Sequence, residues 1–255
     1  MCLILFQFQQ HSNYKLVLAA NRDESYNRPT APAQFWEDEP NVLAGRDLLQ
    51  MGTWLGISTS GRFAGLTNYR HPDHFKSGKL SRGEIVTNFL IGNETSYEYL
   101  HKQVKRKDDY VGYNILVGSP NELKYYSNVE DKIIKVQPGI HGLSNHFLDT
   151  PWPKVEIGKK KLQSYLEQVE TVDPEELFSI LADSEEASVD ELPDTGIGLE
   201  LERKLSSMFI KMPDYGTRCS TVLTIDHDNN VTFIERTFES GSIKNEEKFE
   251  FQIKK

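Results

Sequence analysis

The chain has 255 residues, of which 38% are hydrophobic and 26% are charged. This composition is typical of a soluble globular protein, and no apolar run approaches the roughly 18–20 residues of a membrane-spanning helix. Asp and Glu number 38 against 29 Lys and Arg, which gives a net charge of −9. Proteins that bind nucleic-acid phosphates carry the opposite balance, so we do not expect a nucleic-acid partner.

The predicted elements alternate between groups of strands and pairs of helices. In chain order they are strands at 2–8 and 15–20, a hairpin at 54–59 and 62–67, helices at 82–91 and 97–107, strands at 113–117, 123–127 and 133–136, helices at 154–169 and 174–182, and strands at 220–225, 231–237 and 248–253. Ser81 is the expected N-cap of the first helix, and Asp173 that of the fourth. The order is not a strict βαβ alternation, so it predicts antiparallel sheets with helices packed outside them, in one domain spanning 1–255.

The two cysteines, Cys2 and Cys219, are too few for a disulfide framework, and no zinc-binding spacing occurs. Free thiols favour a reducing compartment, and we expect the cytoplasm. The apolar start of the chain is short and lacks a basic segment, which indicates a first strand and not a signal peptide. His71-Pro72-Asp73-His74 is the one metal-like pattern, but its proline favours a plain loop, so we expect no metal or cofactor.

The segment 162–202 contains thirteen Asp or Glu and no Lys or Arg. The simpler interpretation is a solvated face with a loop at 184–198. The alternative is an acidic lid or a surface for a partner protein.

Cys2 is the first candidate for chemistry. A small second residue normally permits removal of the initiator Met1, which would leave a thiol and a free α-amine on one residue. Their intrinsic pKa values are about 8.5 and 7.7–8.0, so the amine can serve as the base for its own side chain. The alternative is a small apolar residue in a buried first strand.

Asn21-Arg22-Asp23-Glu24 follows the second predicted strand directly. Four polar residues in a row are costly to bury without partners, and an exposed strand end with a local ion pair is the simpler interpretation. However, a hairpin between the first two strands brings Asn21 to Asp23 close to Cys2. The hairpin therefore predicts a cation, a carboxylate and an amide beside the candidate nucleophile.

These residues resemble the NRDE family, also called the transport-and-Golgi-organisation-2 family, whose namesake motif is Asn21-Arg22-Asp23-Glu24. Further blocks that match it are Met1-Cys2, Gly52-Thr53-Trp54-Leu55-Gly56, Gly65-Leu66-Thr67-Asn68-Tyr69-Arg70, Ser81-Arg82-Gly83, Gly142-Leu143-Ser144-Asn145 and Thr217-Arg218-Cys219-Ser220-Thr221-Val222. The family resembles N-terminal-nucleophile (Ntn) hydrolases, especially the acylases that cleave penicillin V and conjugated bile acids. The resemblance implies an α+β fold, a four-layer αββα sandwich of two antiparallel sheets.

The resemblance also implies roles for individual residues. The nucleophile corresponds to Cys2, the arginine that holds the thiolate to Arg22, and the carboxylate that orients the amine to Asp23. Residues that match the remaining catalytic positions are Asn68 and Asn145 at the oxyanion and the late arginine Arg218, and we expect Asn21, Trp54 and Tyr69 to contact substrate. In the acylases the Arg and the Asp are separated, whereas here they are adjacent and would point to opposite faces of a continuous strand.

The implied activity is hydrolysis or transfer of an acyl group from a small non-peptide amide. The alternative is a binding or carrier protein for haem or an acyl-lipid on the same fold, with Cys2, His71, His74 and His146 as contacts. A third interpretation is a structural partner protein that uses the acidic segment.

Overall fold

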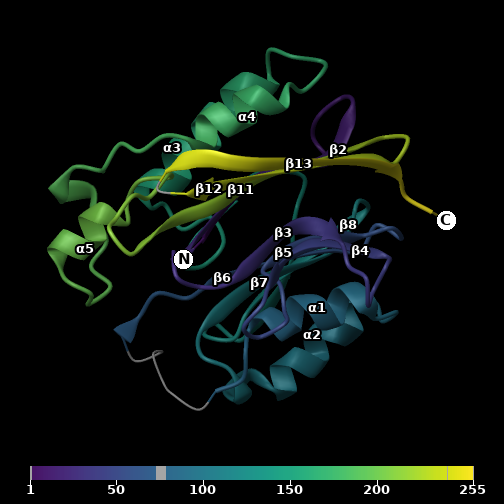
Figure 1. The fold of residues 1–255 in the computed structure, drawn as a ribbon, viewed down its shortest axis with the longest axis horizontal. Coiled ribbons are helices and arrows are strands. Elements are labelled where there is room, and N and C mark those ends of the chain that lie inside the picture. Colours follow the sequence, from purple (N-terminus) through teal and green to yellow (C-terminus); the bar gives the residue numbers. More distant parts are fainter. Residues whose placement is uncertain (1, 73–78, 240, 255) are drawn as a thin grey trace.

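The computed structural model describes residues 2–72, 79–239 and 241–254. Its strands form two antiparallel sheets that lie face to face, and helices cover the outer face of each sheet (Figure 1). The order of layers is therefore helix, sheet, sheet, helix. This arrangement confirms the predicted four-layer αββα sandwich.

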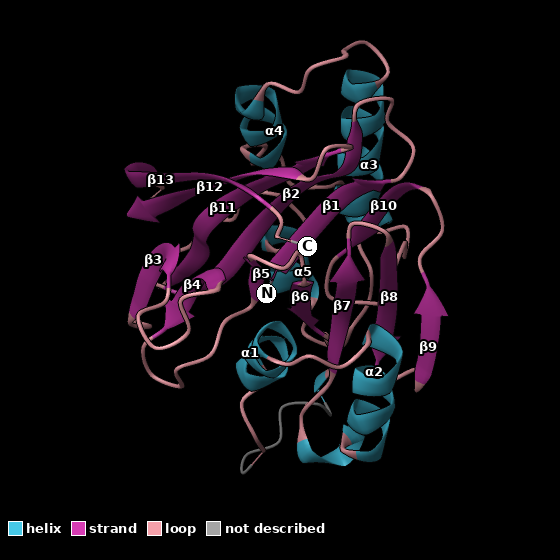
Figure 2. Cartoon of the chain, turned by 90° about the vertical axis from the view of Figure 1, so that its right-hand side faces the viewer, coloured by secondary structure: helices cyan, strands magenta, loops and turns pink. Residues whose placement is uncertain are grey.

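The first sheet has six strands within the described residues. In spatial order they are β10 (Gly139–Leu143), β1 (Cys2–Phe8), β2 (Tyr14–Ser25), β11 (Tyr215–Asp226), β12 (Asn230–Glu239) and β13 (Ser242–Gln252). The helices α3 (Pro153–Leu166) and α4 (Pro174–Leu181) pack on its outer face, where α3 contacts β1 and β10 and α4 contacts β2 and β11 (Figure 2). A short helix, α5 (Leu199–Lys204), precedes β11.

The second sheet has seven strands within the same described ranges. In spatial order they are β3 (Thr30–Phe35), β4 (Val42–Asp47), β5 (Leu55–Ser58), β6 (Phe63–Asn68), β7 (Tyr113–Ser119), β8 (Glu122–Ser127) and β9 (Lys132–Lys135). The helices α1 (Gly83–Ile91) and α2 (Ser96–Lys105) cover its outer face. Across the described part of the chain, no helix has the length and apolarity that crossing a bilayer requires.

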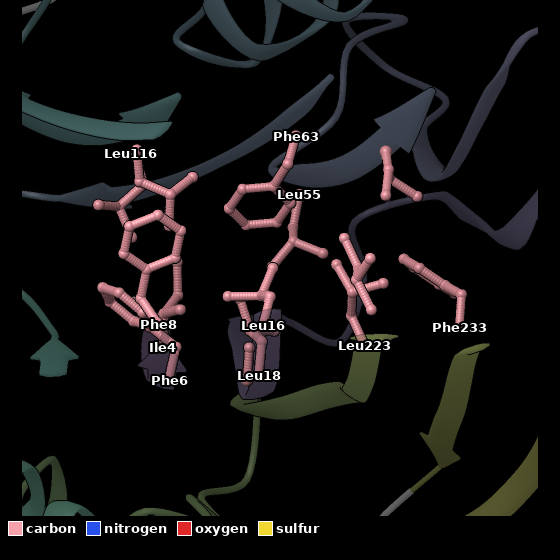
Figure 3. Close-up of a cluster of buried hydrophobic side chains, with 14 of the residues drawn as sticks. Ile4, Phe6, Phe8, Leu16, Leu18, Leu55, Phe63, Leu116, Leu223 and Phe233 are labelled. Atoms are coloured by element: carbon pink, nitrogen blue, oxygen red, sulfur yellow. The ribbon is translucent and has the colours of Figure 1, made fainter. Parts of the chain in front are cut away.

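Strand alternation distributes the apolar side chains among three cores. On β1, Ile4, Phe6 and Phe8 point into the core between the sheets, while Leu3 and Leu5 point toward α3 and α4. Figure 3 shows the side chains of the two sheets meeting in that central core. A third core lies between the second sheet and α1 and α2. Because β1 is buried on both faces, its sequence is apolar except for the buried Gln7 and lacks a period-2 pattern.

The helix caps agree only in part with the sequence. Asp173 caps α4 as predicted, because its Oδ1 accepts the Glu175 backbone N–H at 2.9 Å. The prediction for Ser81 is wrong: the N-cap of α1 is Arg82, and the carbonyl of Ser81, not its hydroxyl, accepts the Glu84 N–H.

Several elements differ from the prediction. The strands β3, β4 and β10 and the helix α5 were not expected, and β2 continues to Ser25. That continuation is stabilised by β11, since Glu24 pairs with Gly216 and Asp23 with Thr217. The four-residue motif therefore lies inside a strand of the sheet and not after its end.

Candidate functional site

The first hairpin places the motif beside Cys2, as the sequence predicts. Cys2 pairs with Arg22 across β1 and β2, and Arg22 pairs in turn with Cys219 on β11. These three residues lie in one row across the sheet. By alternation they share the face of Ile4 and Ala20, so their side chains point into the space between the two sheets.

At this end of the sandwich, residues of both sheets and of the adjoining loops line an open cavity of about 1170 Å³. Six of the predicted site residues contribute to its lining: Cys2, Arg22, Asp23, Trp54, Asn68 and Arg218. The three other predicted residues, Asn21, Tyr69 and Asn145, are not among the described residues that line it. The structure therefore brings together most of the predicted site.

The Cys2 thiol is nearly enclosed, with 7% of the residue exposed. Burial raises the pKa of this thiol and the Asp23 charge adds to the effect, whereas the charges of the chain's N-terminus and of Arg22 and a hydrogen bond with the Asp23 backbone lower it. Only the thiolate is a strong nucleophile. Because the net shift is upward, the thiol needs a base close by, which an adjacent α-amine can supply.

Arg22 lies beside the thiol on the cavity face. Its guanidinium is 3.8 Å from Glu24, which is beyond hydrogen-bond distance, and its side chain is 11% exposed. Glu24 also faces Arg28 at 3.9 Å, and Arg28 donates a hydrogen bond to Asp47 at 2.9 Å. Glu24 is thus shared between two arginines, so the Arg22 charge is only partly compensated at the cavity.

Asp23 points to the opposite face of the sheet, toward the helices, although the residue also reaches the cavity wall. Its Oδ1 accepts a hydrogen bond from Thr217 Oγ1 at 2.8 Å, and its carbonyl accepts one from the Tyr215 hydroxyl at 2.9 Å. Burial raises the pKa of this carboxyl, while the charge of the chain's N-terminus, the charges of Lys154 and Arg70 and the Thr217 hydrogen bond lower it. The adjacent Arg22 and Asp23 therefore approach Cys2 from two sides of one strand.

Asn145 supports the cavity wall from behind. It is fully buried, and its Nδ2 donates to the Asn68 carbonyl at 3.0 Å. The neighbouring Ser144 donates to the Cys2 carbonyl at 3.1 Å. Of the two predicted oxyanion residues, Asn68 lines the cavity and Asn145 holds its backbone in place.

Asn21 and Tyr69 are engaged elsewhere. Asn21 is fully buried on the helix side of β2, where its Nδ2 donates to two backbone carbonyls and its Oδ1 accepts from Ser220 Oγ at 2.5 Å. The Tyr69 hydroxyl lies 3.0 Å from His146 Nε2. Asn21 thus connects the sheet to the C-terminal end of α4 and to the segment that follows α5.

Arg218 sits at a β-bulge, because the pairing of β11 with β2 shifts between Thr217 and Cys219. Its Nη1 donates to the carbonyls of Ser25, Tyr26 and Arg28 at 2.7, 3.1 and 3.1 Å. This guanidinium closes the turn between β2 and β3 and forms part of the cavity wall.

Comparison with known proteins identifies the family. The family model described as "Transport and Golgi organisation 2" matches residues 1–240. The chain is 37% identical over 257 residues to the transport and Golgi organization 2 homolog of Mus musculus, and 38% identical over 261 residues to that of Bos taurus; each alignment covers 93% of both chains. The chain belongs to the transport and Golgi organisation 2 family.

Solved structures support the fold of this family member. A conjugated bile acid hydrolase from Clostridium perfringens, in a C2A mutant form, superposes with a TM-score of 0.56 at 9% identity, covering 99% of this chain and 97% of that one. A second variant of that hydrolase gives a TM-score of 0.51. This likeness shows the Ntn-hydrolase fold.

Two charged residues of this family member were missed as site residues. Arg82, at the start of α1, lines the cavity and donates to the Gly112 carbonyl at 3.2 Å; burial lowers its pKa, whereas the charges of Cys2 and Glu24 raise it. Lys154 is buried, and its charge lowers the pKa of Asp23. Both stand at the start of a helix, where sequence alone predicts exposed side chains.

The alternative haem contacts do not converge on the cavity. Cys2 lines it, but neither His71 nor His146 is among the described residues that do, and His74 and Asp73 lie outside the described residues. Within the described ranges, no group of three or more His, Cys, Asp or Glu is arranged to hold a metal ion. No observation on this cavity therefore favours haem over an amide or acyl ligand.

Proposed function

We propose that this protein is an N-terminal cysteine hydrolase or acyltransferase that acts on a small non-peptide amide. The observation that carries the proposal is the row formed by Cys2 and Arg22 on the cavity face, with Asp23 on the other side of the same strand. The α-amine that would activate Cys2 belongs to its backbone, which lies between these two faces. A cation can then hold the thiolate while a carboxylate holds the amine.

In the proposed reaction, the Cys2 thiol first gives its proton to the α-amine freed by removal of Met1. The thiolate then attacks the amide carbonyl carbon, the carbon–nitrogen bond breaks, and the leaving amine takes the proton from the α-ammonium. Water or another acceptor attacks the resulting thioester, gives its proton to the α-amine, and releases the acyl group while the thiol re-forms. This cycle needs a reduced Cys2, which fits a cytoplasmic location.

The surrounding residues have defined tasks in this scheme. Asn68 would donate to the oxyanion of the tetrahedral intermediate, and the loss of one such donor costs on the order of 10²–10³ in rate. Asn145 would fix the backbone of Asn68 through its hydrogen bond to that carbonyl. Arg218 and Trp54 would shape the cavity around the acyl group.

The test is mass spectrometry of the intact protein after incubation with a panel of small N-acyl amides, lactones and thioesters. Processed protein with a free Cys2 amine should gain an acyl adduct that is absent in Cys2→Ala. Cys219→Ala is the matched control, because Cys219 lies in the same row and burial raises the pKa of its thiol well above the usual value. No adduct on processed protein across the whole panel would overturn the proposal.

A further inference from the structure

A second, smaller cavity of about 230 Å³ lies on the helix-covered face of the first sheet. Its walls come from the C-terminal end of α4, from the segment before β11, and from β11, β12 and β13. Along β12, Glu235 and Thr237 line the larger cavity and Arg236 lines the smaller one; among the described residues, Phe238 alone contributes to both. None of the predicted site residues is among the described residues that line this smaller cavity. It is therefore a place in the fold to which the sequence assigned no role.

Three phenylalanine rings form the apolar part of the smaller cavity. Phe178 and Phe209 are each 5% exposed, and the Phe209 ring meets the Phe238 ring edge-on, with 4.9 Å between their centroids. Ile243 is 60% exposed and forms part of the rim. Pockets for drug-sized ligands measure about 300–1,000 Å³, and an apolar cavity of about 150 Å³ accommodates benzene. The volume therefore suits one ring with a short substituent, and aromatic walls favour edge-to-face contact with an aromatic ring.

The two cations at the smaller cavity differ in their pairing. Arg236 is compensated, because its Nε donates to Glu246 Oε2 at 2.5 Å, its Nη2 donates to Glu175, and its guanidinium carbon lies 3.9 Å from the centroid of the Phe178 ring. Lys211 is exposed, and its Nζ lies 5.4 Å from the centroid of the Phe209 ring. Within the part of the chain that the structure describes, no carboxylate lies within ion-pair distance of Lys211 Nζ. The cavity thus combines an apolar floor with one cation at its rim that can pair with an anion.

We infer that this smaller cavity is a second binding site, and that it takes a small aromatic carboxylate. The ring of the ligand lies among the three phenylalanines, and its carboxylate pairs with Lys211. The alternative role for Lys211 is to cover the Phe209 ring with its methylene stem, which requires no charge. The charge of the ligand therefore separates the two roles. The inference goes beyond the proposed function, since the site does not include Cys2.

The test is an NMR titration of the ¹⁵N-labelled full chain with 3-phenylpropionate and, separately, with its neutral amide. The backbone amide resonances of Phe209, Lys211 and Phe238 should shift saturably, whereas those of Thr53 and Gly83 in the larger cavity should not. The acid should bind about two- to fivefold more tightly than the amide, which is the range expected for one exposed ion pair.

Three variants assign the binding to this cavity. Lys211→Met keeps the apolar stem and removes the charge, so the acid should bind only as tightly as the amide, while the affinity for the amide stays unchanged. Lys160→Met removes an exposed lysine of α3 and should change neither affinity. Ala182→Phe adds a ring at an exposed position of the rim and should prevent both ligands from binding.

Several results would overturn the inference. They are equal affinity of the wild type for acid and amide, an equal loss of both affinities in Lys211→Met, and the absence of saturable shifts at the smaller cavity. Hexanoate carries the same charge without the ring and should bind more weakly than 3-phenylpropionate, so equal or tighter binding of hexanoate would overturn the aromatic part. The proposed function fails or stands separately, because adduct formation on Cys2 does not report on this cavity.

Discussion

Replacement of Asn21 by alanine separates a structural from a substrate-binding role for the first residue of the motif. The side chain donates to the carbonyls of Leu181 and Met208, both at 2.9 Å, and accepts from Ser220 Oγ at 2.5 Å. Asn21→Ala would leave three buried polar groups without this partner, at about 1–3 kcal/mol each. Since water can partly fill the space, we expect a loss of roughly 3–5 kcal/mol in the free energy of unfolding.

For a chain of this length, that loss corresponds to a fall of roughly 10 °C in Tm. Urea unfolding followed by circular dichroism measures the free energy, and Asn121→Ala, an exposed asparagine in the turn between β7 and β8, is the control. The folded fraction of Asn21→Ala should still acylate Cys2 with an unchanged KM. If its Tm stays within about 2 °C of wild type while KM rises, the structural interpretation of Asn21 is refuted.

Three further predictions concern packing and charge. Gly52→Ala should cost about 1–3 kcal/mol of stability, measured by urea unfolding, because the added Cβ would lie 2.7 Å from the Gly83 carbonyl carbon. Gly83→Ala should cost less, because the Cβ added there would lie 3.3 Å from its nearest atom. Equal losses in the two variants would contradict this reasoning. Burial raises the pKa of Glu235 above its usual 4.5, so this carboxyl ionises in the unfolded chain before it ionises in the folded one, and it lowers stability as pH rises above about 4.5. Glu235→Gln should therefore flatten the decline in the free energy of unfolding between pH 4 and 7. The same pH dependence of the unfolding free energy in wild type and variant would argue against this effect. Glu202→Gln should lose about 3–5 kcal/mol in the same assay, because it removes the carboxylate charge that lies 2.7 Å from the buried Arg70 guanidinium. A loss near zero would show that this ion pair is not needed for stability.

The fold could be predicted where the signal is local. The hairpin of β1 and β2 follows from two apolar runs and a polar turn, and its register alone places Arg22 opposite Cys2. The strands β3 and β4 contain Pro32, Gly45 and Asp47, which are poor strand formers, and they exist because neighbouring strands pair with them. Their contribution to the cavity wall was for that reason not visible in the sequence.

The sequence predicts the site residues that lie next to Cys2 but not those that helix packing brings close to it. Cys2, Arg22 and Asp23 are joined by one hairpin, so local topology suffices to bring them together. Arg82 and Lys154 reach the site through the packing of helices onto opposite sheets, which no local pattern encodes. The roles of Asn21 and Asn145 also depend on partners far away in the sequence. The sequence therefore points to both residues as part of the site, but it does not show that their side chains bind neighbouring backbone groups outside the cavity lining.

Arg22 and Asp23 are adjacent in the sequence, whereas the corresponding arginine and aspartate of the acylases are separated. On a continuous strand the two side chains must point to opposite faces, and β2 does continue through both residues. An N-terminal nucleophile, however, has two reactive groups, a side-chain thiol on one face of β1 and a backbone amine in the plane of the sheet. Arg22 faces the thiol from the cavity side, and Asp23 points to the helix-covered side of the sheet, where Thr217 Oγ1 donates to its carboxylate. Two adjacent residues of opposite charge on the neighbouring strand can therefore serve both groups, and no intervening residues are required between them.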